Sequence, residues 1–478
     1  MRVLIASFIF LFLSGNVFSQ TFSLDPTFSN FSSGINNEIN ASAVQEDGKI
    51  LICGPFTSYD GITRNRIARL NSDGSLDTSF DAGAGPISRL GLPGTIATIV
   101  IDPNGKIIVA GNFSSFNGVS RKSIVRLNND GSVDTSLNVT SLFDVNDLLA
   151  VPSISNVVVD NTGNIFISGR FGYRIGTQTK YGLAKVNNSG VLDTTFSNFS
   201  NNATPSDWMV FCTYLLPDGK MLISRSSNPF TPVARLNSDG SLDNAFVVSD
   251  FFGLIKTIYP TVDGGYLLGG SVSNNQNGNH ILVKILSNGR FDGSFQKYPA
   301  AGSSSINEIT SIGIYDNKIY IAGKFSDYGG ASGLNNFARL NLDGTPDETF
   351  NIGTGFDADV KSMSRLTDNK IVLAGSFSAF NTNPVNRICR LTENSLGIKP
   401  LLFDKAMIYN TADSFNVVST GSEINSIQVF SVDGREVFAS ENYFSKKVSI
   451  PFFNDLRNVY VFRITFSNGN SDVVKAVR

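Results

Sequence analysis

The chain has 478 residues, of which 41% are hydrophobic, 11% aromatic and 16% charged. It is long and apolar enough to bury a large core, and a charged fraction below the roughly 25% of an average soluble domain argues against a disordered chain. Lysine and arginine number 38 against 40 acidic residues, so no basic surplus favours a nucleic-acid partner. A single histidine, His280, excludes zinc sites with several histidine ligands and leaves a serine or cysteine nucleophile only one candidate base.

The N-terminus has the layout of a secretory signal peptide. Arg2 precedes an apolar run over residues 3–13, and a more polar stretch follows that ends at Ser19 and Gln20. Short side chains near Ser19 fit cleavage at this point, so residues 1–19 are predicted to be removed on export. The apolar run is too short to span a bilayer, and no membrane span is expected after cleavage. A buried N-terminal strand is the alternative interpretation.

Three cysteines, Cys53, Cys212 and Cys389, follow the signal segment. An odd and sparse count in an exported protein of this length indicates that disulfides do not hold the fold together. Cys53 and Cys389 stand at repeat positions that small residues otherwise occupy, so we expect small core side chains. A disulfide between these two is the alternative.

The dominant feature of the chain is an internal repeat made of two linked sequence blocks. The front block, Gly-Lys-Ile-x-x-x-Gly-x-Phe, occurs at residues 48–56, 105–113, 163–171, 317–325 and 369–377, with degenerate copies at 219–227 and 264–272. The back block, typified by RLNSDGSLDTSF, occurs at residues 69–80, 126–137, 185–196, 235–246, 284–295 and 339–350. Seven front blocks thus accompany six back blocks, and FSLDPTF at residues 22–28 matches the missing tail. This arrangement predicts a ring that the N-terminal strand completes, because an open solenoid normally ends in distinct capping repeats.

Each repeat is predicted to form four short strands joined by Asp-Gly or Asn-Gly hairpin turns. In the second repeat, residues 96–101, 106–110 and 123–127 are three of them. Four strands in a unit of about 50 residues is the size of a β-propeller blade. The linked blocks resemble the delta-60 repeat family over Phe22 to Gly397. This resemblance implies a secreted propeller, and the family has no settled activity to carry over.

The repeat also pairs a cation with a carboxylate eight residues later. The six pairs are Arg69 with Asp77, Arg126 with Asp134, Lys185 with Asp193, Arg235 with Asp243, Lys284 with Asp292, and Arg339 with Asp347. The cation lies on a strand and the carboxylate just after the next turn, so one ion pair per repeat is expected. The seventh cation, Arg390, lacks such a partner, and Asp25 of the N-terminal fragment is predicted to replace it. A calcium loop is the alternative for these Asp-rich turns, but a distal bidentate Glu is missing, and we predict no metal and no cofactor.

Aromatic residues recur in three columns. Two of them are predicted to fill the space between blades: Phe56, Phe113, Phe171, Phe325 and Phe377; and Phe80, Phe196, Phe246, Phe295 and Phe350. The third column lies in the loop after each second strand: Tyr59, Phe116, Tyr173, Tyr328 and Phe380. Its rings, with Trp208, are candidates for a rim that stacks on sugars or peptides, and packing between blades is the alternative. Two lysines near the starts of innermost strands, Lys256 and Lys361, are weak candidates for an anion site.

From about residue 401 the repeat stops and alternating strands continue to the C-terminus. Residues 401–478 are predicted to form a small β-sandwich. They resemble the type A C-terminal sorting domain of the type IX secretion system, on the residues 427–430 and 433–435, the pair Val459-Tyr460, and the pair Val474-Lys475. The resemblance implies the type IX machinery as a partner and export to the exterior or outer surface of a Gram-negative cell. An ordinary adhesive sandwich is the alternative.

Three functional hypotheses follow for an all-β protein with a seven-bladed propeller over residues 20–397. The first is a non-catalytic secreted or surface propeller that binds an extracellular glycan or protein. The second is a carboxylate-dependent glycan hydrolase or lyase, because that chemistry needs no histidine. Its candidate carboxylates are those that the repeats do not share: Asp207, Asp250, Glu308, Asp357 and Asp359. The third is a purely structural surface protein. His280 is expected in an exposed polar loop.

Overall fold

The computed structural model divides the chain into two compact units, Ser19–Asn394 and a second unit that comprises Met1–Phe18 and Ser395–Arg478. It describes residues 20–28, 34–143, 152–198, 209–225, 232–248, 251–274, 278–296, 298, 307–326, 328–331, 333–395, 406–410, 413–419, 422–451, 459–467, 469 and 471–477. The predicted signal peptide and the candidate residues Asp207, Trp208 and Asp250 lie outside these ranges. No described helix is long and apolar enough to cross a membrane.

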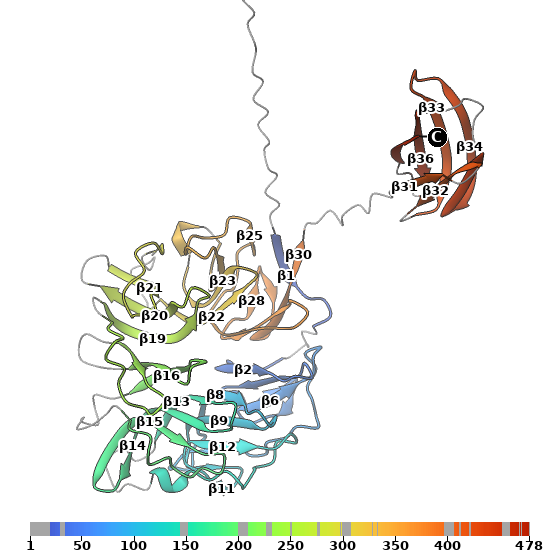
Figure 1. The fold of residues 1–478 in the computed structure, drawn as a ribbon. Helices are drawn as coiled ribbons and strands as arrows, with labels where there is room; N and C mark the ends of the chain where they lie inside the picture. The colour runs from blue at the N-terminus through green and yellow to red at the C-terminus, as the bar shows by residue number, and fades with distance from the viewer. Residues whose placement is uncertain are drawn as a thin grey trace, which may run out of the picture. The chain divides into compact units, whose positions relative to one another are not determined.

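The regular secondary structure in the described residues of the unit Ser19–Asn394 is β-strand, apart from two short 3-10 turns, Thr140–Phe143 and Tyr328–Gly330. The main strands form seven sheets, numbered in chain order, of which sheets 1 to 6 are antiparallel (Figure 1). Sheets 1 to 3 are β2 (Ala41–Val44), β3 (Ile50–Cys53) and β6 (Ile67–Leu70); β8 (Thr95–Ile101), β9 (Ile107–Asn112) and β12 (Ile124–Leu127); and β13 (Ser153–Val159), β14 (Ile165–Ile175) and β15 (Gln178–Val186). Sheets 4 to 6 are β16 (Val210–Leu215), β17 (Met221–Arg225) and β18 (Val233–Leu236); β19 (Phe251–Pro260), β20 (Tyr266–Asn274) and β21 (Gly278–Ile285); and β22 (Glu308–Tyr315), β23 (Lys318–Lys324) and β24 (Phe337–Leu340).

Sheet 7 joins strands from both ends of the unit. It contains β26 (Val360–Arg365), β27 (Ile371–Gly375) and β30 (Ile388–Ser395), and then β1 (Gln20–Leu24) and β25 (Phe350–Asn351). The N-terminal strand β1 therefore lies between β30 and β25 and runs parallel to β25. The small strands of the connecting loops are β4 (Ser58–Tyr59), β5 (Ile62–Thr63), β7 (Pro86–Ile87), β10 (Ser115–Phe116), β11 (Val119–Ser120), β28 (Ala379–Phe380) and β29 (Asn383–Pro384).

The first strands of consecutive sheets contact one another in the order β2, β8, β13, β16, β19, β22, β26, and β26 in turn contacts β2. A hydrogen bond of 2.8 Å between the hydroxyls of Ser42 and Ser362 lies at this last contact. The buried hydrophobic clusters also bridge neighbouring sheets. Phe28 and Ile50, for example, share a cluster with Val372 of sheet 7. The aromatic residues predicted to lie between blades are buried in these clusters, as Phe80 and Phe113 show between sheets 1 and 2.

The fourth strand predicted for each repeat is reduced to a single β-bridge. In sheet 1 the bridge joins Leu70 to Leu76. Asp77 follows, and its Oδ1 accepts hydrogen bonds from the backbone nitrogen (3.0 Å) and the hydroxyl (2.6 Å) of Ser79. Such a side-chain turn bends the backbone away from the extended conformation, so the strand cannot continue. Sheet 7 is the exception, because β1 arrives from the other end of the unit and pairs as a full strand.

The second glycine of the front block is required by a close backbone approach. The pairing of β8 with β9 shifts register between Ile96 and Thr98, which marks a β-bulge. A Cβ on Gly111 would lie 2.1 Å from the carbonyl oxygen of Thr95. The equivalent glycines of other repeats would meet the equivalent carbonyl at 2.1–2.2 Å: Gly54, Gly169, Gly323 and Gly375. The motif therefore encodes the fit of the second strand against a bulge in the first.

The three cysteines are free thiols with buried side chains, as the repeat positions predict. The structure contains no disulfide between Cys53 and Cys389, both of which are described. Burial raises the pKa of the Cys212 thiol to about 11, so this side chain is un-ionised at neutral pH and behaves as a small hydrophobe.

The described residues 406–477 form two further sheets. One contains β31 (Ala406–Asn410), β32 (Ser414–Ser419) and β35 (Lys447–Pro451), and the other contains β34 (Glu436–Ser445), β33 (Ile424–Ser431), β36 (Val459–Phe466) and β37 (Ser471–Val477). Along β36 the side chains alternate, with Tyr460, Phe462 and Ile464 fully buried. These residues pack with Phe415 of the first sheet in one hydrophobic cluster, as expected where two sheets share a core.

Candidate functional site

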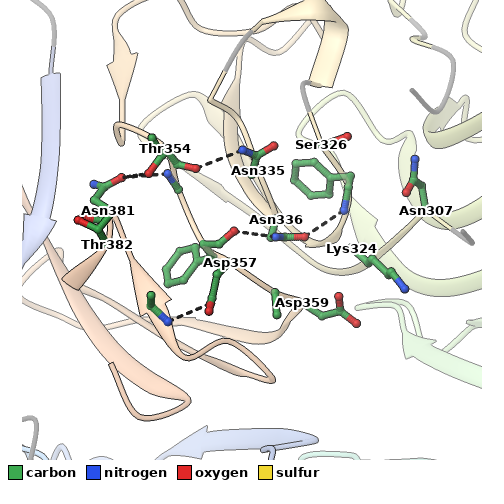
Figure 2. Close-up of a pocket in the computed structure, with 15 residues that line it drawn as sticks. Asn307, Lys324, Ser326, Asn335, Asn336, Thr354, Asp357, Asp359, Asn381 and Thr382 are labelled. Atoms are coloured by element: carbon green, nitrogen blue, oxygen red, sulfur yellow. Dashed lines mark hydrogen bonds between the residues drawn. The ribbon is translucent and has the colours of Figure 1, made fainter. Parts of the chain in front are cut away.

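A pocket of about 610 Å³ lies between sheets 6 and 7 (Figure 2). Sheet 6 contributes Lys324, at the end of β23, and the loop residues Asn335 and Asn336 before β24. Sheet 7 contributes the loop 354–359 before β26 and residues 379–382 around β28. Most of these positions are in loops that connect the strands, which is where a rigid scaffold commonly carries its binding residues.

Side-chain amides hold the loop 354–359 in place. Asn381 Oδ1 accepts a hydrogen bond from the backbone nitrogen of Gly355 (3.0 Å), and Asn335 Nδ2 donates to the carbonyl oxygen of Thr354 (3.2 Å). Asn336 Nδ2 donates to the carbonyl oxygen of Phe356 (3.0 Å), which ties sheet 6 to sheet 7 (Figure 2). Asn336 and Asn381 have φ angles of 64° and 49°, a region that asparagine tolerates better than most residues. The pocket wall is thus fixed by its own hydrogen bonds.

Asp357, a candidate catalytic carboxylate, uses both of its oxygens in hydrogen bonds within the chain. Its oxygens accept hydrogen bonds from the backbone nitrogens of Ser378 (2.8 Å) and Ala379 (2.9 Å) and from the Ser378 hydroxyl (2.6 Å). Burial alone would raise the pKa of Asp357, but these hydrogen bonds outweigh it and lower the pKa. At the equivalent place in sheet 1, Asn36 Oδ1 accepts from the nitrogens of Thr57 and Ser58. The position therefore needs an acceptor rather than an acid.

Two side chains of opposite charge line the pocket without a partner among the described residues. Lys324 comes from sheet 6 and Asp359 from the loop that leads into sheet 7 (Figure 2). Among the residues that the structure describes, neither has an oppositely charged atom within 4.0 Å. Both side chains are half-buried. Unlike Asp357, which also lines this pocket, they are ionic groups that the described residues leave available for a ligand.

The other candidate carboxylate in the described ranges, Glu308, lies near the weakly predicted anion site. Its Oε2 is 3.9 Å from Lys256 Nζ, and Lys361 Nζ is 2.9 Å from Glu38 Oε2. Burial would raise the pKa of Glu38, but hydrogen bonds from Lys361 and the Ser376 hydroxyl lower it overall. Both lysines therefore face a carboxylate of the chain, which lowers their attraction for a free anion.

The seven cation–carboxylate pairs expected from the repeat have one common geometry. The cationic nitrogen lies 2.7–3.0 Å from Asp Oδ2: Arg69–Asp77 (2.7 Å), Arg126–Asp134 (2.9 Å), Lys185–Asp193 (3.0 Å), Arg235–Asp243 (2.8 Å), Lys284–Asp292 (2.9 Å), Arg339–Asp347 (2.7 Å) and Arg390–Asp25 (2.7 Å). The arginines also reach the next sheet, as where Arg69 Nη1 donates to the carbonyl oxygen of Asn129 (2.7 Å). These residues link sheets together and are structural.

A second cation at the same carboxylate escaped the sequence analysis. The lysine of the front block approaches Asp Oδ2 in five repeats: Lys49–Asp77 (2.9 Å), Lys106–Asp134 (2.9 Å), Lys220–Asp243 (2.8 Å), Lys318–Asp347 (3.0 Å) and Lys370–Asp25 (3.0 Å). Hydrogen bonds from Lys220 and Arg235 lower the pKa of Asp243 to about 2, against the opposing effect of burial. The recurrence of Lys in Gly-Lys-Ile was the available signal. It was overlooked because this lysine and the aspartate lie in different blocks.

The aromatic column proposed as a binding rim is part of the core. Tyr59, Phe116, Tyr173, Tyr328 and Phe380 are each at most 3% exposed. The phenol of Tyr59 donates to the carbonyl oxygen of Gly74, and that of Tyr173 to Leu183. The rim prediction is wrong for these five residues, because their loops fold over the sheet edges and leave no ring face for a ligand. Trp208 lies outside the described residues.

The prediction of an exposed His280 is also wrong. His280 is 4% exposed and belongs to β21, where it pairs with Val272 of β20. Its Nδ1 lies 3.1 Å from the carbonyl oxygen of Tyr298. The polar residues before it suggested a loop, but β21 already begins at Gly278, and its pairing with β20 buries this side chain.

The fold and the repeated contacts define an all-β protein built from β-propeller repeats. Six segments match the family model described as "Domain of unknown function (DUF5122) beta-propeller": residues 45–80, 103–137, 161–196, 216–246, 316–350 and 366–395. This match confirms the propeller repeats that the delta-60 resemblance predicted. No curated protein shows significant sequence similarity to the chain.

Several solved structures resemble the chain at low similarity. The extracellular domain of a protein assigned as a hybrid two-component system of B. thetaiotaomicron has 13% identity and a TM-score of 0.43, with 96% of this chain and 57% of that chain covered. A second such domain from the same organism has 11% identity and a TM-score of 0.44, covering 96% and 59%. Apo prolyl oligopeptidase B from Galerina marginata has 11% identity and a TM-score of 0.40, covering 82% and 57%. The chain spans less than two thirds of each of these structures.

Proposed function

We propose that this protein is a secreted, non-catalytic β-propeller of seven blades that binds an extracellular ligand, either a glycan or a protein. In this proposal each of sheets 1 to 7 is a blade, and β1 closes the ring. The contact of β26 with β2 and the ion pair of Asp25 with Arg390 support closure. The residues after the propeller form a small sandwich, which the shared core of its two sheets supports.

The observation that carries the binding function is the pocket between sheets 6 and 7. Its wall is held by amide hydrogen bonds, and Lys324 and Asp359 are left for a ligand. Binding is favoured over glycan hydrolysis by the state of the carboxylates. A general acid needs a raised pKa, whereas hydrogen bonds from the chain lower the pKa of Asp357 and that of Glu38. The unpaired Asp359 is the one feature that favours the hydrolase or lyase alternative.

Filling the pocket should abolish binding. We expect Ser326→Trp, at an exposed lining position, to weaken ligand binding at least tenfold, because the indole occupies the space a ligand needs. The measurement is binding of the mature chain to glycan and protein arrays, followed by titration of the hits. The matched control is Val262→Trp, at a position that is 90% exposed and outside the pocket lining. Hits that bind Ser326→Trp as tightly as the parent chain would place the ligand elsewhere, and an absence of hits would favour a purely structural surface protein.

We also propose that the protein leaves a Gram-negative cell in two steps. Residues 1–19 direct it across the inner membrane, and residues 401–478 act as a type A sorting signal for the type IX secretion machinery. The apolar run over residues 3–13 and the Asp433-Gly434-Arg435 turn of the C-terminal segment support this route. The destination is the exterior or the outer cell surface.

Deletion of residues 401–478 should leave the propeller in the periplasm. Cell fractionation and protease accessibility on intact cells are the measurements, and the expected result is a folded, protected propeller. As a test of sufficiency, residues 401–478 fused to a periplasmic reporter should carry the reporter to the surface. Surface display of the truncated chain would contradict the sorting role and favour an adhesive sandwich.

A further inference from the structure

We propose that the ligand of the pocket between sheets 6 and 7 is a polypeptide that presents a cationic group to Asp359 and an anionic group to Lys324. The proposal rests on the proposed binding function and names the class of ligand. Its first support is an ion pair between a lysine of one first strand and an acid at the start of the next sheet, which forms at two boundaries. The boundary between sheets 6 and 7 has the acid but not the lysine.

At five boundaries a side chain at the bulge of the first strand, or Asn40 at the equivalent position before β2, reaches the next sheet. Three of these residues donate a hydrogen bond to a carbonyl oxygen there: Asn40 to Ile96 (3.0 Å), Ser155 to Val210 (2.6 Å) and Thr310 to Val360 (2.9 Å). At two other boundaries the bulged residue is a lysine. Lys256 faces Glu308 and Lys361 faces Glu38. Each of these acids comes directly before a buried isoleucine, Ile309 or Ile39, at the start of the next sheet.

Asp359 holds this acidic position at the boundary between sheets 6 and 7, but its cation is missing. The residue that corresponds to Lys256 and Lys361 is Thr310, whose hydroxyl is engaged by the carbonyl oxygen of Val360. Three successive sheets thus begin with an acid, Glu308, Asp359 and Glu38, and among the described residues only the middle one has no cation within 4.0 Å. A half-buried carboxylate with no cation nearby is stabilised most by a ligand that brings a cation to it.

Lys324 supplies the opposite charge in the same pocket. The corresponding positions after the second strand hold Pro55, Asn112, Arg170 and Ser376, so the ammonium at this boundary is not part of the repeat. Lys324 and Asp359 come from different sheets and do not neutralise each other in the described structure. A ligand with one cation and one anion would satisfy both, and polypeptides carry such groups side by side.

The lining also disfavours a neutral glycan. The two aromatic residues of the pocket, Phe325 and Phe356, are 4% and 3% exposed and present no open ring face on which a sugar could stack. The remaining lining consists of amides, hydroxyls, small residues, Lys324, Asp359 and Asp357, and the oxygens of Asp357 accept hydrogen bonds from Ser378 and Ala379. Charged groups placed across an interface confer specificity for the complementary charge pattern, so this pocket should select by charge.

The test is binding of the mature full-length chain to four sets of synthetic peptides and to neutral oligosaccharides. The peptide sets carry Lys or Arg with Asp or Glu, basic residues only, acidic residues only, or no charge. We expect the mixed-charge set to bind tightest, with an affinity that falls as salt rises. Asp359→Asn should weaken binding of mixed-charge and basic peptides about tenfold, and Lys324→Gln that of mixed-charge and acidic peptides about tenfold, as expected for one charge-assisted hydrogen bond.

Two controls separate the possible failures. Glu348→Gln removes an exposed charge outside the pocket lining and should leave all affinities unchanged. Tight binding of neutral oligosaccharides that Ser326→Trp abolishes but Asp359→Asn and Lys324→Gln leave intact would overturn the peptide inference and keep the binding function. Peptide binding that none of the three pocket variants alters would overturn the inference and the proposed pocket together, as would binding of no probe.

Discussion

Asp25→Ala is expected to destabilise the unit Ser19–Asn394 by about 3–5 kcal/mol, as for removal of one partner from a buried ion pair. The Asp25 side chain is buried, and its Oδ2 lies 2.7 Å from Arg390 Nε and 3.0 Å from Lys370 Nζ. Its Oδ1 accepts hydrogen bonds from the nitrogen and hydroxyl of Thr27. Alanine removes all four contacts and leaves the Arg390 guanidinium buried without its carboxylate. The measurement is the free energy of unfolding from urea denaturation.

The pH dependence of this effect has a definite sign. Burial alone would raise the pKa of Asp25, but the hydrogen bonds from Thr27, Lys370 and Arg390 outweigh it and hold the pKa well below its ordinary value. A carboxyl group with a depressed folded-state pKa contributes its full stabilisation above its unfolded pKa of about 4 and loses it on acidification. The difference between the parent chain and Asp25→Ala should therefore be largest near neutral pH and shrink as the pH falls below about 4.

Two controls distinguish ring closure from the loss of any repeated ion pair. Asp193→Ala breaks the pair with Lys185, whose two side chains are 21% and 27% exposed, and should cost about 1 kcal/mol or less. Asp77→Ala breaks a buried pair within sheet 1 and should leave β1 in place. Only Asp25→Ala should speed hydrogen exchange in residues 20–28 selectively. Equal protection of this segment in Asp25→Ala and Asp77→Ala would contradict a closing role for β1.

Gly111→Ala is expected to destabilise the same unit by about 1–3 kcal/mol or more, the usual cost of forcing an extra carbon into a packed site. The new Cβ would stand 2.1 Å from the carbonyl oxygen of Thr95 and 2.9 Å from Ile96 Cα. Both atoms belong to the backbone, so no side-chain rotation can relieve the clash, and β8 and β9 must separate. Urea denaturation again gives the free energy of unfolding.

Gly293→Ala is the matched control for this substitution. A Cβ there meets nothing within 4 Å, and the φ of Gly293 is not in the left-handed region. The free energy of unfolding should change by no more than about 0.5 kcal/mol. Any increase in stability would arise because Ala restricts the unfolded chain more than Gly does. Equal stabilities of the Gly111 and Gly293 variants would show that the second glycine of the front block has another role.

Much of the architecture could be predicted because each repeat carries its own local information. The Asp-Gly turns, the apolar strands and the spacing of eight between Arg69 and Asp77 all lie within one repeat, and five more repeats restate them. Even the pairing of Arg390 with Asp25 could be predicted from the sequence. The last repeat lacks its back block, and the fragment at residues 22–28 matches the tail of that block. The sequence predicted a full fourth strand where the structure has a single β-bridge, because the side-chain turn at Asp77 competes with an extended backbone.

Side-chain exposure and the pocket could not be predicted in the same way. The column of Tyr59 and the strand of His280 have polar or loop-like neighbours in sequence, and only the folding of hairpins over adjacent sheets buries them. Among the candidate carboxylates, Asp357 and Asp359 are two residues apart and looked equivalent. The structure engages the first with Ser378 and Ala379 and leaves the second facing the pocket.

The sequence by itself determined that this protein is built of β-propeller repeats, with an N-terminal fragment that completes the last repeat. It could do so because strand, turn and ion-pair signals act over a few residues and recur along the chain. The tertiary structure alone decided where a ligand could bind. Lys324 and Asp359 line one pocket only because sheets 6 and 7 pack together, and Thr310 stands where two other boundaries have a lysine. Such differences between repeats act together only where neighbouring sheets meet.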